Sequence, residues 1–257
     1  MSRELCFWSI GDGQHSHMLQ TLVNSFRAVG MQEDFHVISD REIAGAITHK
    51  VASFDKSCYW FKFTFLQQVI KNLDYDYCVF LDADNYFVRK PPPLLDLMQG
   101  SPVHAFLESD CTLPSPRPEW HRCPLPIYVD IMRECGITQE AMYNVNGGLF
   151  IVKHSAIDLV CELAEDFWKH SFLRGYVFTD EPPLAYVVQM LCKDSSLHLL
   201  RDHTNVWCSD WLGCFEGRVP DGKEWIFKDY MKNEIFTVNP AIVHALKSKE
   251  ALVVAGR

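Results

Sequence analysis

The sequence predicts an α/β fold in which helices flank a mixed, Rossmann-like sheet. Short apolar runs of strand length recur along the chain, and such runs are typical of strands buried on both faces. A segment of helical periodicity separates the first two runs. Polar residues follow directly after several runs, at the edge where open α/β sheets bind their ligands.

The composition is that of an ordinary globular protein. The chain has 257 residues, of which 48% are hydrophobic and 22% charged, so it forms one large domain or two small ones. Its net charge of −9, without a Lys/Arg run, excludes nucleic acid as the main partner. No stretch has the length of a membrane span or the apolar core of a signal peptide. We therefore expect no membrane span.

The ten cysteines predict reduced thiols. Several lie in apolar runs, where a thiol behaves as a small core group: Cys6, Cys78, Cys161 and Cys192. There is no Cys-x-x-Cys and no Cys/His quartet with zinc spacing. Together with the missing signal peptide, this usage favours a cytoplasmic location.

The first elements resemble the opening of a nucleotide-binding half-sheet. We expect a strand, a helix and a second strand, at residues 5–10, 18–29 and 35–38. Gly30 fits the position just after the helix. Gly11-Asp12-Gly13 lacks the third glycine of a dinucleotide fingerprint, so the pattern indicates a nucleotide site without indicating NAD.

The most informative stretch is the apolar run 78–81, which ends at Asp82-Ala83-Asp84 and Asn85. Two carboxylates at the end of a buried strand suit Mg²⁺ or Mn²⁺, and an ion there can hold a diphosphate. Asp and Asn are also common turn residues, so a strand-to-turn junction explains the same pattern.

The later elements alternate between helices and strands. The sequence predicts helices at 59–72, 94–98, 155–172 and 184–191, and strands at 103–107, 149–152 and, as the last one, 235–238. Lys62 stands among the aromatic residues of its helix, either as a phosphate contact or as a surface lysine. Residues 111–126 contain five prolines and predict an irregular loop, which either faces substrate or is an inert excursion.

Two further stretches place polar groups beside predicted strands. Asn146 precedes Gly147-Gly148, and paired glycines permit close approach to a ligand, although Asn-Gly also forms tight turns. Thr179 is predicted to cap the next helix, with Asp180 and Glu181 in its first turn.

Near the end, aromatic residues alternate with acidic ones over 203–225, a pattern that suits either a sugar ring or packing of a loop-rich lobe. Trp207, Trp211, Phe215 and Trp225 are these aromatic residues. His244 then lies close to Lys247 and Lys249, and a single histidine is more often structural than a ligand.

In this order, the chain resembles a GT-A-fold, nucleotide-sugar-dependent glycosyltransferase of family 8, the group that includes glycogenin and bacterial galactosyltransferases. The resemblance spans residues 5–249 and implies a single catalytic domain over 1–257, with a nucleotide-binding half to about residue 110 and an acceptor-binding half over 111–257. It rests on the apolar strand into Asp82-Ala83-Asp84, on Asn146-Gly147-Gly148-Leu149-Phe150, on Asp180-Glu181 at a helix start, and on His244.

The resemblance also implies roles for these residues. Asp82, Asp84 and His244 would hold Mn²⁺ or Mg²⁺, and Asp180 and Glu181 would be catalytic. The implied contacts to the donor are Ser9, Gly11, Asp12, Lys62, Asp82, Ala83, Asn146, Gly147, Gly148 and Lys247. The implied reaction moves a sugar, from UDP in the expected case, to a hydroxyl of a glycan, lipid-linked or protein acceptor.

Two departures from the family pattern leave details open. No glycine separates His244 from Lys247, which leaves the phosphate contact open, and Glu181 stands where the family commonly has glutamine. A second carboxylate suits a general base in an inverting enzyme, or a group that stabilises a cationic sugar in a retaining one. We expect retention.

Three alternatives to the glycosyltransferase interpretation remain. A haloacid-dehalogenase-type phosphatase expects Thr or Val where this chain has Tyr86, and it carries its motif near the N-terminus. A sugar nucleotidyltransferase expects cationic residues in the glycine-rich loop at residues 11–14, which has none. A catalytically inactive sugar-binding protein would keep the same residues.

Overall fold

The structure is a computed structural model that describes residues 3–52, 60–192, 206–210, 213–218, 225–229 and 234–245. Its central sheet is formed by β1 Arg3–Ile10, β2 Asp34–Ser39, β3 Ile47–Lys50, β4 Tyr75–Leu81, β6 Val103–Asp110 and β9 Tyr143–Lys153. The helices are α1 Ser16–Ala28, α2 Phe61–Gln68, α3 Leu125–Glu134, α4 Ile157–Leu173 and α5 Glu181–Leu191. Single 3-10 turns are η1 Gly13–His15, η2 Ile70–Asn72, η3 Leu94–Leu97 and η4 His154–Ala156.

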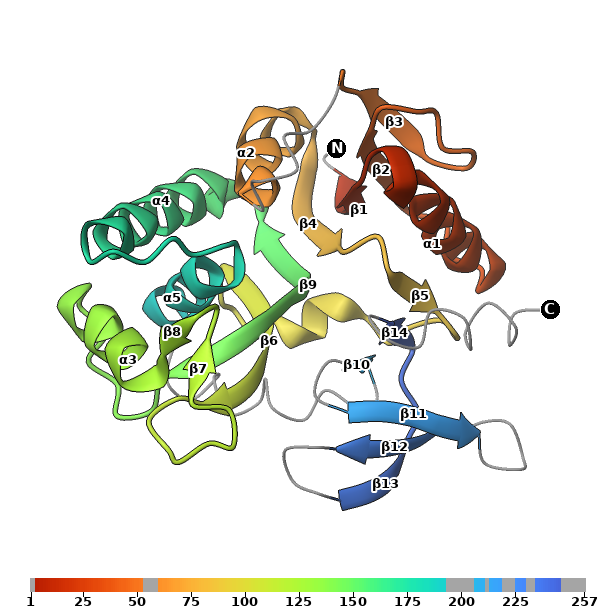
Figure 1. The fold of residues 1–257 in the computed structure, drawn as a ribbon. Coiled ribbons are helices and arrows are strands. Elements are labelled where there is room, and N and C mark those ends of the chain that lie inside the picture. Colours follow the sequence, from red (N-terminus) through yellow and green to blue (C-terminus); the bar gives the residue numbers. More distant parts are fainter. Residues whose placement is uncertain are drawn as a thin grey trace. The chain divides into compact units, whose positions relative to one another are not determined.

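The six strands of the central sheet lie in the order β3-β2-β1-β4-β9-β6 (Figure 1). The sheet is mixed, because β2 and β3 pair in parallel whereas β6 and β9 pair antiparallel. Helices flank it, so the predicted α/β class with a mixed, Rossmann-like sheet is confirmed.

Shorter strands form three further sheets. They are β5 Asn85–Phe87, β7 Glu119–Trp120, β8 Cys123–Pro124, β10 Trp207–Ser209, β11 Gly213–Arg218, β12 Trp225–Asp229, β13 Glu234–Val238 and β14 Ile242–His244. The orders are β10-β14-β5, β11-β12-β13 and β7-β8. Among the helices of the described segments, none is both long and apolar enough to cross a membrane.

By its contacts, the chain divides into two compact units. Of the described residues, the first unit takes 3–7, 60–80 and 95–192, and the second takes 8–52, 81–94 and everything from 206 onward. The predicted division near residue 110 stays a prediction.

In the second unit, α1 supplies a large part of the core. Phe26 of α1 packs edge-on against Phe35 and Phe87, with ring centroids 5.0 and 5.2 Å apart. The helix ends in a Schellman motif, in which Gly30 has a φ of +83° and the N–H of Met31 donates to the carbonyl of Phe26. The predicted role of Gly30 after the helix is therefore confirmed.

In the first unit, α5 is a core helix. It packs against α4, β9 and β6, and its residues from Pro182 to Gln189 are all buried. The rings of Phe167 on α4 and Tyr186 on α5 stack with centroids 4.9 Å apart. This packing holds the beginning of α5, and with it Asp180 and Glu181, in a fixed place.

Several predicted elements differ from those observed. The prediction of an irregular loop at 111–126 is wrong, because β7, β8 and the start of α3 lie in this segment. Pro124 and Pro126 were interpreted as breakers, but they flank the first residue of α3, where a missing N–H costs nothing.

Three boundaries also differ. Asp180, and not Thr179, is the N-cap of α5, since Thr179 directs its hydroxyl elsewhere. The strand at 235–238 is not the last, because β14 follows it. β9 begins at Tyr143, six residues before the predicted strand, so Asn146, Gly147 and Gly148 lie inside it.

Candidate functional site

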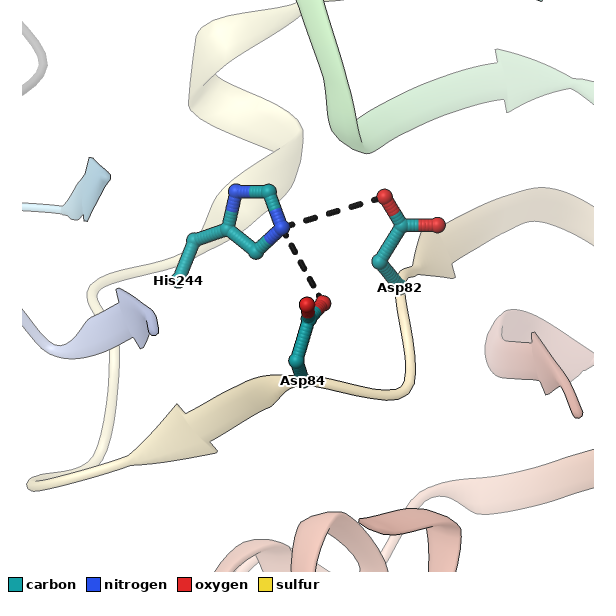
Figure 2. Close-up of side chains that lie close together, drawn as sticks. All are labelled: Asp82, Asp84 and His244. Atoms are coloured by element: carbon teal, nitrogen blue, oxygen red, sulfur yellow. Dashed lines mark hydrogen bonds and ion pairs between the residues drawn. The ribbon is translucent and has the colours of Figure 1, made fainter. Parts of the chain in front are cut away.

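The second unit brings Asp82, Asp84 and His244 together into what we call the Asp-Asp-His cluster. One potential ligand atom from each residue lies within 4.8 Å of the others. The Nε2 atom of His244 is 3.1 Å from Oδ1 of Asp84 and 3.8 Å from Oδ2 of Asp82. Figure 2 shows both carboxylates pointing toward the same nitrogen of the imidazole ring.

The two aspartates are placed by a tight turn between β4 and β5. The carbonyl of Asp82 accepts from both the backbone N–H and the side-chain amide of Asn85, each at 3.0 Å. Asn85 is buried and accepts from the indole N–H of Trp207 at 2.9 Å. The sequence of this stretch also allowed a simple strand-to-turn junction. The turn is present, and it places both carboxylates at the cluster.

His244 is held between two neighbouring strands. In the register of the small sheet it pairs with Asn85 on β5 and with Ser209 on β10. Its Nδ1 atom lies 3.2 Å from the Ser209 hydroxyl, and the Trp207 indole stacks on its ring. If Nδ1 carries the proton and donates to Ser209, the lone pair of Nε2 faces the carboxylates, as metal-ligating histidines require.

This donor set fits a divalent cation. Carboxylate oxygens suit Mg²⁺ and Mn²⁺, and an added imidazole nitrogen favours Mn²⁺ over Mg²⁺. Ligand atoms with bonds of about 2.1 Å to one ion lie roughly 3 to 4 Å apart. The distances from Nε2 of His244 to the Asp84 and Asp82 oxygens, 3.1 and 3.8 Å, fall in this range. Three protein ligands leave coordination positions for oxygens of a ligand.

The residues expected to bind the nucleoside lie in the same unit, at the end of β1. Ser9 is fully buried, and its hydroxyl donates to the carbonyl of Leu81 at 2.6 Å, which ties the end of β1 to the strand that precedes Asp82. The N–H of Gly11 donates to the carbonyl of Ile38. Asp12 is partly exposed and begins the turn before α1. Their contact with a nucleoside stays a prediction.

A second group of polar residues gathers in the first unit. We call it the Glu181 cluster: Lys62, His121, Gly147, Asp180 and Glu181. Lys62 is buried, and its ammonium lies 2.5 Å from Oδ2 of Asp180 and donates to the carbonyl of Gly147 at 3.1 Å. The interpretation of Lys62 as a surface lysine is therefore wrong. Its ammonium also lies 4.8 Å from the ring centre of Phe80 on β4.

Gly147 lies at an irregularity of β9. The register with β6 passes from Phe150 opposite Ala105 to Asn146 opposite Phe106, so three residues of β9 bulge out of the pairing. A Cβ atom on Gly147 would approach the Asp180 carboxylate and Cγ of Glu181 to 3.1 Å each. The glycine therefore permits β9 to lie close to the side chains of Asp180 and Glu181. Its close approach to a ligand stays a prediction.

Glu181 uses both of its carboxylate oxygens. The N–H of Gly147 donates to Oε1 at 2.9 Å, and Nε2 of His121 lies 2.7 Å from Oε2. The other ring nitrogen of His121 is 2.8 Å from the Thr179 hydroxyl. About a quarter of the Glu181 side chain is exposed, whereas Asp180 is buried.

Asn146 belongs to a neighbouring network of amides. Its side-chain N–H donates to Glu108 at 3.0 Å, and its carbonyl oxygen accepts from the N–H of Gly148 at 2.9 Å. The other oxygen of Glu108 accepts from Asn144 at 3.1 Å. Glu108 thus orients the amide that the sequence marked as a contact to the transferred sugar.

The structure therefore brings the predicted residues into two groups. The Asp-Asp-His cluster lies in the second unit with Ser9, Gly11, Asp12 and Ala83. The Glu181 cluster and the Asn146 network lie in the first unit. Lys247, Lys249 and Trp211 lie outside the described residues.

Sequence reasoning missed several partners of these groups: Glu108, His121, Ser209 and, as a packing partner of His244, Trp207. Each is distant in sequence from the residue it contacts, and no motif connects the two. Trp207 and Trp225 are buried, so packing, and not a sugar face, is their use. Trp225 belongs to a core group with Phe227 and Val243.

The thiols of Cys78, Cys111, Cys123, Cys161 and Cys192 are free and buried, and that of Cys135 is free and partly exposed. Burial raises the pKa of the Cys111 thiol to about 12 and that of Cys192 to about 11. A protonated thiol is a poor nucleophile, so these two cysteines are structural.

Comparison with known proteins adds no relationship. No family model matches the chain, and no curated protein is significantly similar to it.

Proposed function

We propose that the protein is a metal-dependent glycosyltransferase. It would move a sugar from a nucleotide-sugar donor, a UDP-sugar in the expected case, to a hydroxyl of a glycan, lipid-linked or protein acceptor. The observation that carries the proposal is the convergence of Asp82, Asp84 and His244, because His244 is 160 residues from Asp84 in sequence. The order of motifs that resembles family 8 supports it further.

Asp82, Asp84 and His244 would hold a divalent ion, and a bound ion would supply Lewis-acid compensation for the charge that builds on the departing diphosphate. The chain's own residues keep the cluster ready for this role. The Ser209 hydroxyl lies within hydrogen-bond distance of Nδ1 of His244 and can accept a hydrogen bond from its N–H when Nε2 binds an ion, and the stacked Trp207 restrains the plane of the ring.

Within the Glu181 cluster, the two adjacent acids have different roles. Asp180 is buried and neutralised by Lys62, which makes it a structural counter-ion. Glu181 is partly exposed, so it is the carboxylate that can face the sugar or the acceptor. We expect retention of configuration, with Glu181 stabilising the positive charge on the sugar ring, and a general-base role if the reaction inverts.

The proposal is tested by the release of nucleoside diphosphate from a panel of nucleotide sugars, with Mn²⁺, with Mg²⁺ and with a chelator. We expect one donor to be consumed in the presence of the metal, and we expect Asp84→Ala to lose at least about 100-fold in rate. Asp76→Asn, an exposed acid on β4, is the matched control and should behave like the wild type.

The same variants separate the glycosyltransferase from its rivals. Metal-dependent hydrolysis of simple phosphate esters, without turnover of any nucleotide sugar, would indicate the phosphatase. Pyrophosphate-dependent exchange of a nucleotide sugar would indicate the nucleotidyltransferase. If no nucleotide sugar is turned over, and metal with nucleotide does not raise the melting temperature of the wild type, the proposal fails.

A further inference from the structure

His121 lies in a hairpin turn whose backbone is unfavourable for its residues. β7 and β8 pair with Trp120 opposite Cys123, so His121 and Arg122 are the two residues of the turn. Both have a positive φ, 49° and 62°, as a type I′ turn requires. Asn and Gly are the residues usually found in such turns, and neither is present. A strained conformation persists only where the surroundings hold it in place.

What holds the turn is its contact with the beginning of α5. The imidazole of His121 bridges the Glu181 carboxylate, at 2.7 Å, and the Thr179 hydroxyl, at 2.8 Å. Trp120 packs edge-on against Tyr128 with ring centroids 5.0 Å apart, which anchors the hairpin on α3. The strained residue is thus the one that reaches the carboxylate of the Glu181 cluster.

The contact from His121 completes the restraint of Glu181. Gly147 donates to one carboxylate oxygen, and Nε2 of His121 lies 2.7 Å from the other. Because an ionised carboxylate can only accept, Nε2–H is the donor of this bond, and the plane of the carboxylate is fixed from two sides. With His121 removed, Oε2 loses its donor and the carboxylate is free to turn about the remaining bond. About a quarter of each of the two side chains is exposed, so the pair is open to a ligand.

We propose that His121 is a positioning residue for Glu181 in the sugar-transfer reaction. This inference rests on the proposed function, and it assigns to residues 111–126 a role in orienting a group of the reaction. Asn at position 121 would suit the positive φ better, but its side chain is too short to reach Glu181. The unfavourable backbone conformation of His121 is therefore explained by its contact with that carboxylate.

Three variants test the role of His121. His121→Asn suits the positive φ but is too short to reach Oε2, whereas His121→Gln carries an amide N–H at about the distance of Nε2. Arg122→Asn is the matched control, since Arg122 is an exposed residue of the same turn. Rates at saturating donor, the KM for the donor and the melting temperature are measured for each.

We expect His121→Asn to keep the melting temperature of the wild type or exceed it, while kcat falls about 10- to 100-fold and KM changes less than about 3-fold. His121→Gln should recover most of the rate, and Arg122→Asn should match the wild type. An unchanged kcat in His121→Asn overturns the inference. Equal losses in the Asn and Gln variants overturn it as well, because the donated bond would then be irrelevant.

A measurement without turnover separates this inference from the proposed function. The ¹⁵N resonances of the His121 imidazole are recorded in the wild type and in Glu181→Gln. We expect the tautomer and the Nε2–H signal to change when the carboxylate is replaced. If they do not change, His121 does not bond Glu181 in solution and the inference fails, whatever the donor panel shows. If the signal changes as expected but the wild type consumes no donor, the bond between His121 and Glu181 is confirmed. The proposed function is then overturned, and with it the role of that bond in sugar transfer.

Discussion

Asp180 and Glu181 are adjacent in sequence, but their surroundings give them different chemistry. Asp180 is buried beside Lys62, and the side chain caps no backbone N–H of α5 although it occupies the N-cap position. Glu181 is partly exposed and bonds a backbone N–H and an imidazole. The family resemblance implies a catalytic role for both, and the difference in burial is the basis on which we propose that only Glu181 reaches the substrate.

The buried pair makes a prediction about stability. Lys62→Met leaves the Asp180 carboxylate buried without its cation, so we expect the free energy of unfolding to fall by about 3–5 kcal/mol. Lys62→Met combined with Asp180→Leu removes both charges and should lose much less. Urea unfolding measures all of these changes.

Lys71→Met is the matched control for this prediction. Lys71 pairs with Asp158 on the surface, so its loss should cost less than about 1 kcal/mol. Equal losses in Lys62→Met and in the double variant would show that the buried charge is not the cause.

At the scale of elements, the strands and helices with clear periodicity were predicted, while those shaped by special turns were not. β1, β2, β4, α1 and α4 follow directly from apolar runs or helical spacing. The β7–β8 hairpin has no Asn-Gly signal, because its turn is stabilised by contacts that are distant in sequence. β9 continues through its glycines because they form a bulge, which local sequence cannot distinguish from a turn.

The Asp-Asp-His cluster could be predicted from the sequence because its residues belong to recognisable motifs. Asp82 and Asp84 follow a buried strand, which places them at a ligand-binding edge, and the resemblance supplied His244. His121 and Glu108 could not be found in this way, because their partners lie 60 and 38 residues away and no motif connects them.

A histidine pair between β2 and β3 predicts that the stability of the protein depends on pH. Nδ1 of His36 lies 2.9 Å from Nε2 of His49, and burial lowers the pKa of His49. The unfolded chain therefore binds a proton more readily than the folded one, so the stability from neutral His49 is complete above the ordinary pKa of about 6.5 and is lost as the pH falls through the folded value.

Hydrogen exchange of the β3 amides measures this effect. After correction for the intrinsic rate, we expect protection to be lower at pH 5.5 than at pH 7.5, and His49→Gln should remove most of the difference. A variant that keeps the full dependence would place its origin in another group.

At the scale of the whole molecule, each unit is assembled from separate stretches of the chain. Of the described residues, the second unit takes 8–52, the short stretch 81–94 around Asp82 and Asp84, and the C-terminal segments. All three residues of the Asp-Asp-His cluster therefore belong to the second unit, although the first unit contributes most of the chain between them.

Binding of ligands to the Asp-Asp-His cluster should stabilise the folded protein. Mn²⁺ with UDP, each at about 100 times its dissociation constant, should stabilise the protein by about 2.7 kcal/mol or more, which is a rise of roughly 5–10 °C in melting temperature. Calorimetry with and without a chelator measures the shift. Asp84→Ala should show no metal-dependent part of it, and an undiminished shift in that variant would place the ion at another site.

The position of His244 in β14 has a consequence for how the protein is made. A ribosome adds residues in order, and Asp84 emerges long before the histidine that completes its cluster, 160 residues later. β14 pairs with β5 directly after the two aspartates, so the same late strand closes both the small sheet and the ligand set. A nascent chain stalled before β14 cannot offer the three-ligand set to an ion, so the cluster can form only after His244 has been synthesised.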